Sequence, residues 1–212
     1  KYLAREDSRV IGLIGAGAQN KTQLMALNHV LHYIEEVKIN DLNKERAEQF
    51  AKEMSEKLNL PIKVVNTAEE AVRGSDVFVT ATVTKTPIVK ADWIEPGQLY
   101  LHVGSHECEF DVINRADKIV VDDWEELKHR GVESISIMYS KGLFDEKNIH
   151  AQLGEIVNGI KQGRASKDEF IYFNSVGMGI QDVALASVLY EKALKENIGT
   201  ELDIIGGASL VP

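Results

Sequence analysis

Hydrophobic positions in the first forty residues follow two different periods. The apolar run over residues 9–14 has the length of a strand and breaks into glycines, which predicts a tight turn. Apolar residues then recur three and four positions apart and predict a helix, at Leu24, Leu27, Leu31 and Ile34. Residues 37–39 alternate as a second strand that stops at Asp41. The pattern therefore predicts a strand, a glycine turn, a helix, a strand and an acidic residue, in that order.

The alternation of strands and helices continues through the first half of the chain. Asn43 can cap a helix whose apolar stripe ends before Asn59, and Thr67 with Glu70 has the spacing of a capping box. Further strands are predicted at residues 62–65, 77–82, 99–104 and 118–121. Such alternation indicates parallel strands joined by right-handed crossovers. We therefore expect an α/β fold, a Rossmann-type doubly wound parallel sheet.

The pattern after Asp123 is less regular and ends in a long apolar helix. We expect helices and one strand there, at residues 124–129, 153–163 and 177–197 and at residues 169–173. Asp123 and Glu126 fit an N-cap and its partner better than a pair of catalytic acids. The last helix is apolar on most sides, which predicts burial between layers or domains as a C-terminal helical appendage.

Composition narrows the class of protein. The 212 residues are 44% hydrophobic, enough for a full core. A net charge of −9 argues against nucleic acid and anionic membranes as partners. Cys108 is the only cysteine and no signal-like N-terminus is visible, so we expect a cytoplasmic protein. The segment before residue 8 resembles the tail of a helix, which suggests that something upstream is missing.

Glycines in the first turn point to a dinucleotide. Gly15 and Gly17 stand where the turn and the close approach of a pyrophosphate need them, and Asn20 takes the third position of the fingerprint. Asp41 follows Gly17 by 24 residues, where the second strand would bring a carboxylate to the adenosine ribose. That carboxylate would repel a 2′-phosphate, so NAD is favoured over NADP. A glycine pair that only makes a turn, or a methyltransferase with a similar first turn, are the alternatives.

Several motifs together resemble the ornithine cyclodeaminase, alanine dehydrogenase and mu-crystallin family. They cover nearly the whole chain, at residues 14–19, 69–76, 80–82, 87, 95–97, 103–104, 173–177 and 181–182. The resemblance implies cofactor contacts beyond the first turn. The full set of expected cofactor-binding residues is Gly15, Gly17, Ala18, Gln19, Asp41, Thr80, Thr82, Val103, Gly104 and Ser175. Thr80 and Thr82 can also be read as ordinary strand residues, and Ser175 as a helix cap.

The candidate catalytic residues are His106 and Asp182. Cyclodeaminases of this family carry an acid just after the Val-Gly pair, whereas this chain has His106, with Glu107 as a weaker substitute. A neutral imidazole can act as a general base near pH 7. Asp182 lies in an apolar helix, so we expect it to pair with a basic group or to face the site. His102, His106, Glu107 and Cys108 are crowded and lack a second ligand pair, so no metal is expected.

The resemblance implies an NAD(P)-dependent oxidoreductase that transfers hydride at the Cα of an amino or imino acid. Without an acid after Gly104, a dehydrogenase or imine reductase is favoured over a cyclodeaminase. The alternative is a non-catalytic, mu-crystallin-type protein that binds a dinucleotide and a small ligand. Family members place a substrate and dimerisation domain before the stretch that begins here. We therefore expect an NAD(P)-binding domain over residues 1–172 and a C-terminal helix and tail over 173–212 that would pack on the missing substrate domain. A homodimer would form through that missing domain, and this chain alone should not turn over substrate.

Overall fold

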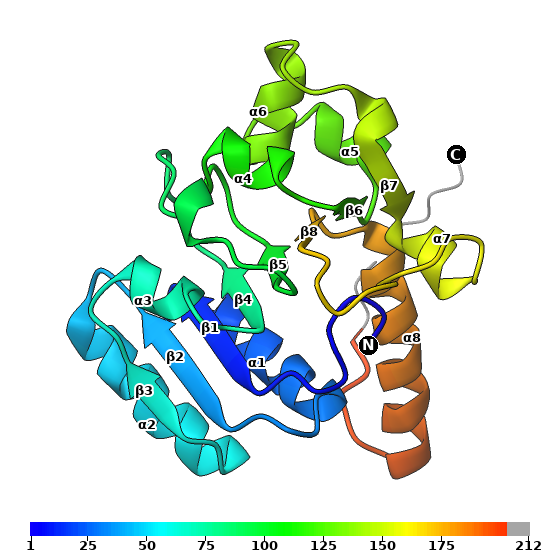
Figure 1. The fold of residues 1–212 in the computed structure, drawn as a ribbon. Coiled ribbons are helices and arrows are strands. Elements are labelled where there is room, and N and C mark those ends of the chain that lie inside the picture. Colours follow the sequence, from blue (N-terminus) through cyan, green and yellow to red (C-terminus); the bar gives the residue numbers. More distant parts are fainter. Residues whose placement is uncertain (203–212) are drawn as a thin grey trace, which may run out of the picture. The chain divides into compact units, whose positions relative to one another are not determined.

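The computed structural model describes residues 1–202 and divides the chain into two compact units (Figure 1). The first unit spans residues 1–176 and contains the whole sheet, and the second begins at Gly177. The expected boundary after residue 172 lies inside the last strand, β8 (Ile171–Asn174). Because β8 pairs with strands on both sides, residues 173–176 belong with the first unit.

The sheet has eight parallel strands, as the alternation of elements predicts. The seven strands before β8 are β1 (Val10–Ile14), β2 (Glu36–Asn40), β3 (Ile62–Val64), β4 (Val77–Thr80), β5 (Leu99–His102), β6 (Lys118–Val121) and β7 (Ile149–Gln152). Their order in the sheet is β3-β2-β1-β4-β5-β8-β6-β7. The chain therefore builds one side of the sheet from β1 outward, returns to the middle for β4, and inserts its last strand between β5 and β6.

Helices cover both faces of the sheet, which confirms the doubly wound fold (Figure 1). On one face α1 (Ala18–Val30) and α2 (Lys44–Leu58) pack against β1, β2 and β4. Short helices pack on the other face, namely α3 (Ala68–Val72), α4 (Phe110–Asn114), α5 (Trp124–Lys128) and α6 (Ser134–Ser140). The helix α7 (Leu153–Val157) and two 3-10 turns, Ala91–Trp93 and Glu146–Asn148, complete the first unit.

The predicted N-caps set the starts of three helices. The side chains of Asn43, Thr67 and Asp123 accept hydrogen bonds from the third backbone N–H of α2, α3 and α5. The capping role of Asp123 is therefore confirmed. Each cap lies in the short connection between a strand and the helix that follows it.

Some predicted bounds are wrong, because local periodicity continued past the true ends. The first helix stops at Val30, and Ile34 lies outside it. Residues 158–163 are not helical, since Gly159 adopts a left-handed conformation with φ of 72° directly after α7. The sequence patterns also missed α4, α6 and β7, which are too short to show a clear period.

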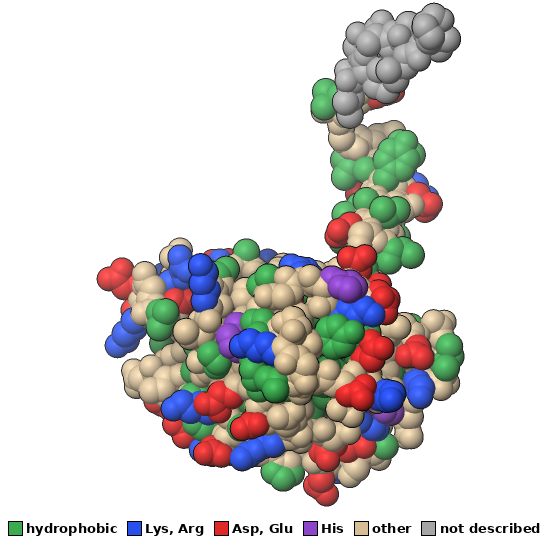
Figure 2. All heavy atoms as spheres, turned by 90° about the horizontal axis from the view of Figure 1, so that it is seen from above, with side chains coloured by type: hydrophobic (Ala, Val, Ile, Leu, Met, Phe, Trp, Pro, Cys, Tyr) green, Lys and Arg blue, Asp and Glu red, His purple; other side chains and the backbone are tan. Residues whose placement is uncertain are grey.

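The second unit consists of α8 (Gly179–Glu196) and the residues that follow it. None of the residues of α8 is buried, so the burial expected for this helix is not found among the described residues. Its large apolar side chains are exposed, and Figure 2 shows them along the visible side of the helix. Among residues 1–202, no helix combines the length and the apolar character that a membrane span requires.

Candidate functional site

The candidate site lies where the strand order reverses. β1 and β4 are neighbours in the sheet, yet the chain leaves β1 toward β2 and leaves β4 toward β5. The loops that follow these two strands therefore diverge and open a crevice at the carboxyl edge. Open parallel sheets bind their ligands at this kind of position.

The glycine turn after β1 is built around Gly15. Its φ of 99° is a left-handed conformation that favours glycine, and a Cβ there would lie 2.8 Å from the carbonyl oxygen of Ala81. Asn20, at the third position of the fingerprint, is fully buried, and its Nδ2 donates to the carbonyls of Ile14 at 2.9 Å and Gly15 at 2.6 Å. Asn20 thus holds the turn by two hydrogen bonds, where the fingerprint usually has a glycine or alanine.

Gly17 differs from Gly15, because the protein itself does not require a glycine there. Its φ of −94° is accessible to any residue, and a Cβ would meet no atom within 4 Å. The helix that Gly17 opens has no capping side chain and no acidic residue in its first turn. Free N–H groups and the helix dipole therefore form a cradle for an anion, with open space beside the backbone. This arrangement fits the pyrophosphate of a dinucleotide.

Asp41 lies beside the glycine turn, as its spacing predicts. Its Oδ2 accepts from the backbone N–H of Ala16 at 2.7 Å, and its Oδ1 accepts from that of Asn43 at 2.8 Å. The half-buried carboxylate is therefore held at the end of β2, next to the proposed anion cradle. A carboxylate in this place can accept hydrogen bonds from ribose hydroxyls.

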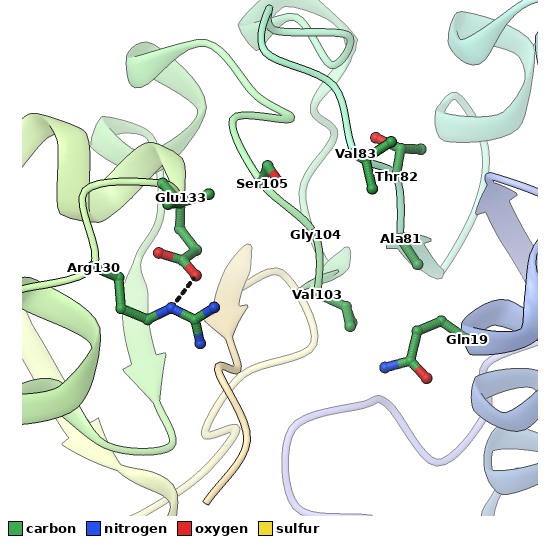
Figure 3. A pocket seen from close by; sticks show the side chains of 10 residues that line it. Gln19, Ala81, Thr82, Val83, Val103, Gly104, Ser105, Arg130 and Glu133 are labelled. Atoms are coloured by element: carbon green, nitrogen blue, oxygen red, sulfur yellow. Dashed lines mark ion pairs between the residues drawn. The ribbon is translucent and has the colours of Figure 1, made fainter.

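A pocket of about 260 Å³ extends from the glycine turn across the ends of β4 and β5 (Figure 3). It contains four of the expected cofactor-binding residues, Gln19, Thr82, Val103 and Gly104. Six further residues line it, namely Ala81, Val83, Ser105, Arg130, Val132 and Glu133. The pocket is thus shared by the loops after β1, β4 and β5 and the segment before α6.

Arg130 and Glu133 are pocket residues that sequence reasoning missed. Figure 3 shows them on the side opposite Gln19, joined by an ion pair of 3.1 Å between Nε and Oε1. The Glu133 side chain is buried, whereas that of Arg130 is 48% exposed. Nη1 of Arg130 also donates to the Val176 carbonyl at 3.3 Å. The Arg130 guanidinium is therefore held at the pocket wall by its ion pair with Glu133. In the sequence, only the i, i+3 spacing of the two residues could have suggested this pair.

Thr80 does not line the pocket, contrary to its expected cofactor contact. Its side chain is fully buried, and the hydroxyl lies 2.8 Å from the Tyr100 hydroxyl and donates to Glu107 Oε2 at 2.6 Å. Successive residues of a strand point to opposite faces, and Thr80 belongs to the face under α3 and α4 rather than to the carboxyl edge. Thr82, two residues beyond the strand end, does reach the pocket.

The two expected catalytic residues belong to different units of the chain, and each is described by itself. His106 is half-buried and is not a pocket residue; its Nδ1 lies 3.0 Å from Ser134 Oγ and its ring lies 5.4 Å from that of Phe110. Partial burial and, less strongly, the charge of Lys141 lower the pKa of His106. Asp182 is exposed in the first turn of α8, so the burial that would require it to pair is not observed.

Ser175 lies beside the ends of the central strands. Ser175 directly follows β8, and His102 is the last residue of β5. The Ser175 backbone N–H donates to the His102 carbonyl at 3.1 Å. The N-cap of α8 is Met178, so Ser175 does not cap that helix as the alternative interpretation supposed. Its position at the carboxyl edge is compatible with the expected cofactor contact.

The side chains that invited a metal interpretation are engaged elsewhere. Both ring nitrogens of His102 have partners, the Tyr172 hydroxyl at 2.6 Å and the Ser105 carbonyl at 2.7 Å. Burial raises the pKa of the Cys108 thiol to about 12 and lowers that of His102 to about 4. Among the described residues, no three His, Cys, Asp or Glu side chains form a group that could hold a metal ion.

Comparisons with known proteins agree with this geometry. A model described as the ornithine cyclodeaminase/mu-crystallin family matches residues 1–197. An alanine dehydrogenase of Archaeoglobus fulgidus is 41% identical over 207 residues, which cover 95% of this chain and 62% of that protein. A Δ1-pyrroline-2-carboxylate reductase of Bacillus cereus is 34% identical over 209 residues, with 96% and 63% covered.

Solved structures share the fold over the same extent. The Δ1-pyrroline-2-carboxylate reductase of Thermococcus litoralis, in complex with NADH and L-proline, is 40% identical with a TM-score of 0.88 over 95% of this chain and 63% of that one. An archaeal alanine dehydrogenase dimer with bound NAD gives the same identity and TM-score over 96% and 63%. The chain thus spans less than two thirds of the length of these relatives. It belongs to the ornithine cyclodeaminase/mu-crystallin family.

Proposed function

We propose that the protein is an NAD-dependent oxidoreductase that transfers hydride at the Cα of an amino or imino acid. The observation that carries the proposal is Gly17, where neither backbone conformation nor packing needs a glycine but an approaching pyrophosphate does. The relatives support the rest, since they include an alanine dehydrogenase and pyrroline-2-carboxylate reductases, and two related structures contain NADH or NAD.

The order of the strands supports a separate place for each half of the dinucleotide. The N–H groups of residues 17–19 would hold the pyrophosphate above β1, since those of Gly15 and Ala16 already donate to Asn40 and Asp41, and Asp41 would accept from the adenosine ribose on the β2 side. The other half must then extend across β4 and β5, into the pocket lined by Thr82, Val103 and Gly104. When bound there, NAD supplies the hydride acceptor or donor. Arg130, whose Nε is paired with the Glu133 carboxylate, would present its remaining guanidinium N–H donors at the far wall to a carboxylate on the substrate.

Net dehydrogenation or imine reduction is the reaction type that fits best. A cyclodeamination of the family type would use an acid directly after the Val-Gly pair, and here Ser105 and His106 follow Gly104. Ser105 lines the pocket and His106 does not, so a catalytic role of His106 gains no support from its position. We further propose that substrate binding and dimerisation involve sequence beyond that covered by this chain, because its relatives are longer.

Binding of NADH and NADPH to wild type and to variants of Asp41 tests the proposal. Wild type should prefer NADH by about tenfold or more, because the Asp41 carboxylate would face the 2′-phosphate of NADPH. Asp41→Ala should narrow this gap. Asp41→Asn, which can still accept from the Ala16 N–H, separates the effect of the charge from support of the turn.

A matched control is Asp145→Ala, which removes another Asp that accepts from a loop N–H, remote from β1 and β2. It should leave both affinities unchanged. Nucleotide fluorescence gives the dissociation constants. Equal affinities in wild type would refute the role of Asp41, and failure to bind either nucleotide would refute the dinucleotide site itself.

A further inference from the structure

A single buried carboxylate joins the two loops that form the pocket. Glu107 is fully buried between the ends of β4 and β5. Its Oε1 accepts from the Thr82 backbone N–H at 2.5 Å and from the Thr82 hydroxyl at 2.7 Å. Its Oε2 accepts from the Gly104 N–H at 2.8 Å and from the Thr80 hydroxyl at 2.6 Å. Each oxygen thus receives one backbone N–H and one hydroxyl.

The two loops that Glu107 joins run side by side beyond the strands. Val103 N donates to the Thr80 carbonyl at 3.0 Å, and Ser105 N donates to the Thr82 carbonyl at 3.4 Å. Gly104 lies between these two bonds, and a Cβ there would come within 2.3 Å of the Thr82 oxygen and 2.5 Å of Glu107 Oε1. Gly104 is therefore a glycine because the carboxylate and the neighbouring loop approach its backbone so closely.

The site is made for the carboxylate form of Glu107. The ionised group accepts from all four donors at once, whereas a proton on either oxygen would require a threonine hydroxyl to turn and accept, because the backbone N–H groups can only donate. Burial raises the pKa of Glu107 above its ordinary value, and the hydrogen bonds from Thr80, Thr82 and Gly104 offset this effect only in part. The neighbouring His102 ring, 3.3 Å from Oε2, completes the enclosure.

We propose that Glu107 is a positioning residue for the second half of the dinucleotide, the half that carries the nicotinamide. This inference rests on the proposed function, since the pocket lined by Thr82 and Gly104 is where that half would bind. Glu107 has no exposed surface and acts through these two residues. Its four hydrogen bonds come from Thr80, Thr82 and Gly104 and not from the glycine turn, which would hold the adenosine half together with Asp41.

Replacement of Glu107 by glutamine shows why the carboxylate matters. Glutamine has one acceptor oxygen and one NH₂ group. Whichever way the amide is turned, the NH₂ faces either the Thr82 N–H or the Gly104 N–H, and neither backbone group can rotate to accept. One loop therefore loses its anchor in Glu107→Gln, although size and shape are retained.

Binding of two ligands to the 212-residue chain tests this role. ADP carries the adenosine and the pyrophosphate but neither the second ribose nor the nicotinamide, and NADH carries both halves. In Glu107→Gln, the affinity for ADP should stay within twofold of wild type. The affinity for NADH should fall by about tenfold, the loss expected when a buried N–H is left without its acceptor. A general loss of structure would weaken both ligands alike.

Two further variants keep the test decisive. Glu109→Gln is the matched control, because Glu109 lies on the same loop and accepts from a backbone N–H, that of Ala91, but does not line the pocket. It should leave both affinities unchanged. Thr80→Val removes one hydroxyl donor to Glu107 at a fully buried position and should lower NADH affinity in the same direction but less. If Glu107→Gln does not fold, Thr80→Val decides.

The outcomes separate this inference from the proposed function. If wild type binds neither ADP nor NADH, the dinucleotide site is refuted. If wild type binds both but the NADH affinity of the folded variants falls no more than that for ADP, the site stands and the positioning role of Glu107 is refuted.

Discussion

Replacing Gly17 by alanine should abolish tight NADH binding without destabilising the protein. The added methyl group would meet no protein atom within 4 Å, and the φ of −94° needs no left-handed conformation. It would instead occupy the open space beside the first turn of α1, where a pyrophosphate must approach the backbone. The Gly17→Ala variant therefore tests NADH binding without a change in protein stability.

The expected change in stability is close to zero, because two small effects cancel. Gly17 is the N-cap of α1, where alanine is less favourable than glycine by a few tenths to about 1 kcal/mol. Alanine also restricts the unfolded chain, which contributes about 0.4–1 kcal/mol in the opposite direction. The net effect is within about 0.5 kcal/mol, a shift of no more than about 2 °C in Tm for a chain of this length.

Gly15→Ala is the matched comparison, since the same methyl group two residues earlier should be costly. The φ of 99° strains any residue with a Cβ, by about 1–3 kcal/mol, and the new atom would lie 2.8 Å from the Ala81 oxygen. Thermal unfolding should show a loss of several degrees for Gly15→Ala and almost none for Gly17→Ala, while NADH fluorescence should show at least tenfold weaker binding in both. Unchanged NADH affinity in a folded Gly17→Ala variant would refute the proposed pyrophosphate cradle.

Two further predictions concern the buried groups under the site. Burial holds the pKa of His102 at about 4 against 6.5 in the unfolded chain, so between these values only the unfolded state takes up the proton. The contribution of the neutral ring to the free energy of unfolding is therefore complete above pH 6.5 and falls by about 3 kcal/mol as the pH drops to 4. The free energy of unfolding in urea should depend more steeply on pH in wild type than in His102→Gln across this range. Equal slopes would contradict the assignment. Cys108 is fully buried with its pKa raised to about 12, so a thiol reagent at pH 8 should label it only at the rate of unfolding, and rapid labelling of the native protein would show that the loop opens.

Local patterns along the chain were enough to predict the repeated units of the fold. The apolar runs of β1, β2, β4 and β6, and the caps at Asn43, Thr67 and Asp123, are local signals, because a strand period or a cap depends on residues within a few positions. Spacing also placed Asp41 beside the glycine turn, since β1 and β2 are consecutive in the chain and adjacent in the sheet.

The family followed from motifs spread along the chain, and the comparisons confirm it. What such motifs could not supply is the direction in which a side chain points. Thr80 and Thr82 are two residues apart in one motif, yet Thr80 is fully buried and Thr82 lines the pocket. The reason is that β4 ends at Thr80, so that Thr82 lies in the loop beyond the strand.

Contacts between residues far apart in the chain became visible only once the strands were paired. The insertion of β8 between β5 and β6 depends on pairings across about seventy and fifty residues, for which the sequence holds no periodic signal. The same is true of Arg130 at the pocket wall and of Glu107, which sequence reasoning took for a substitute catalytic acid. A buried carboxylate is defined by the donors that surround it, and the chain brings Thr82 and Gly104 to Glu107 only when β4 and β5 lie side by side.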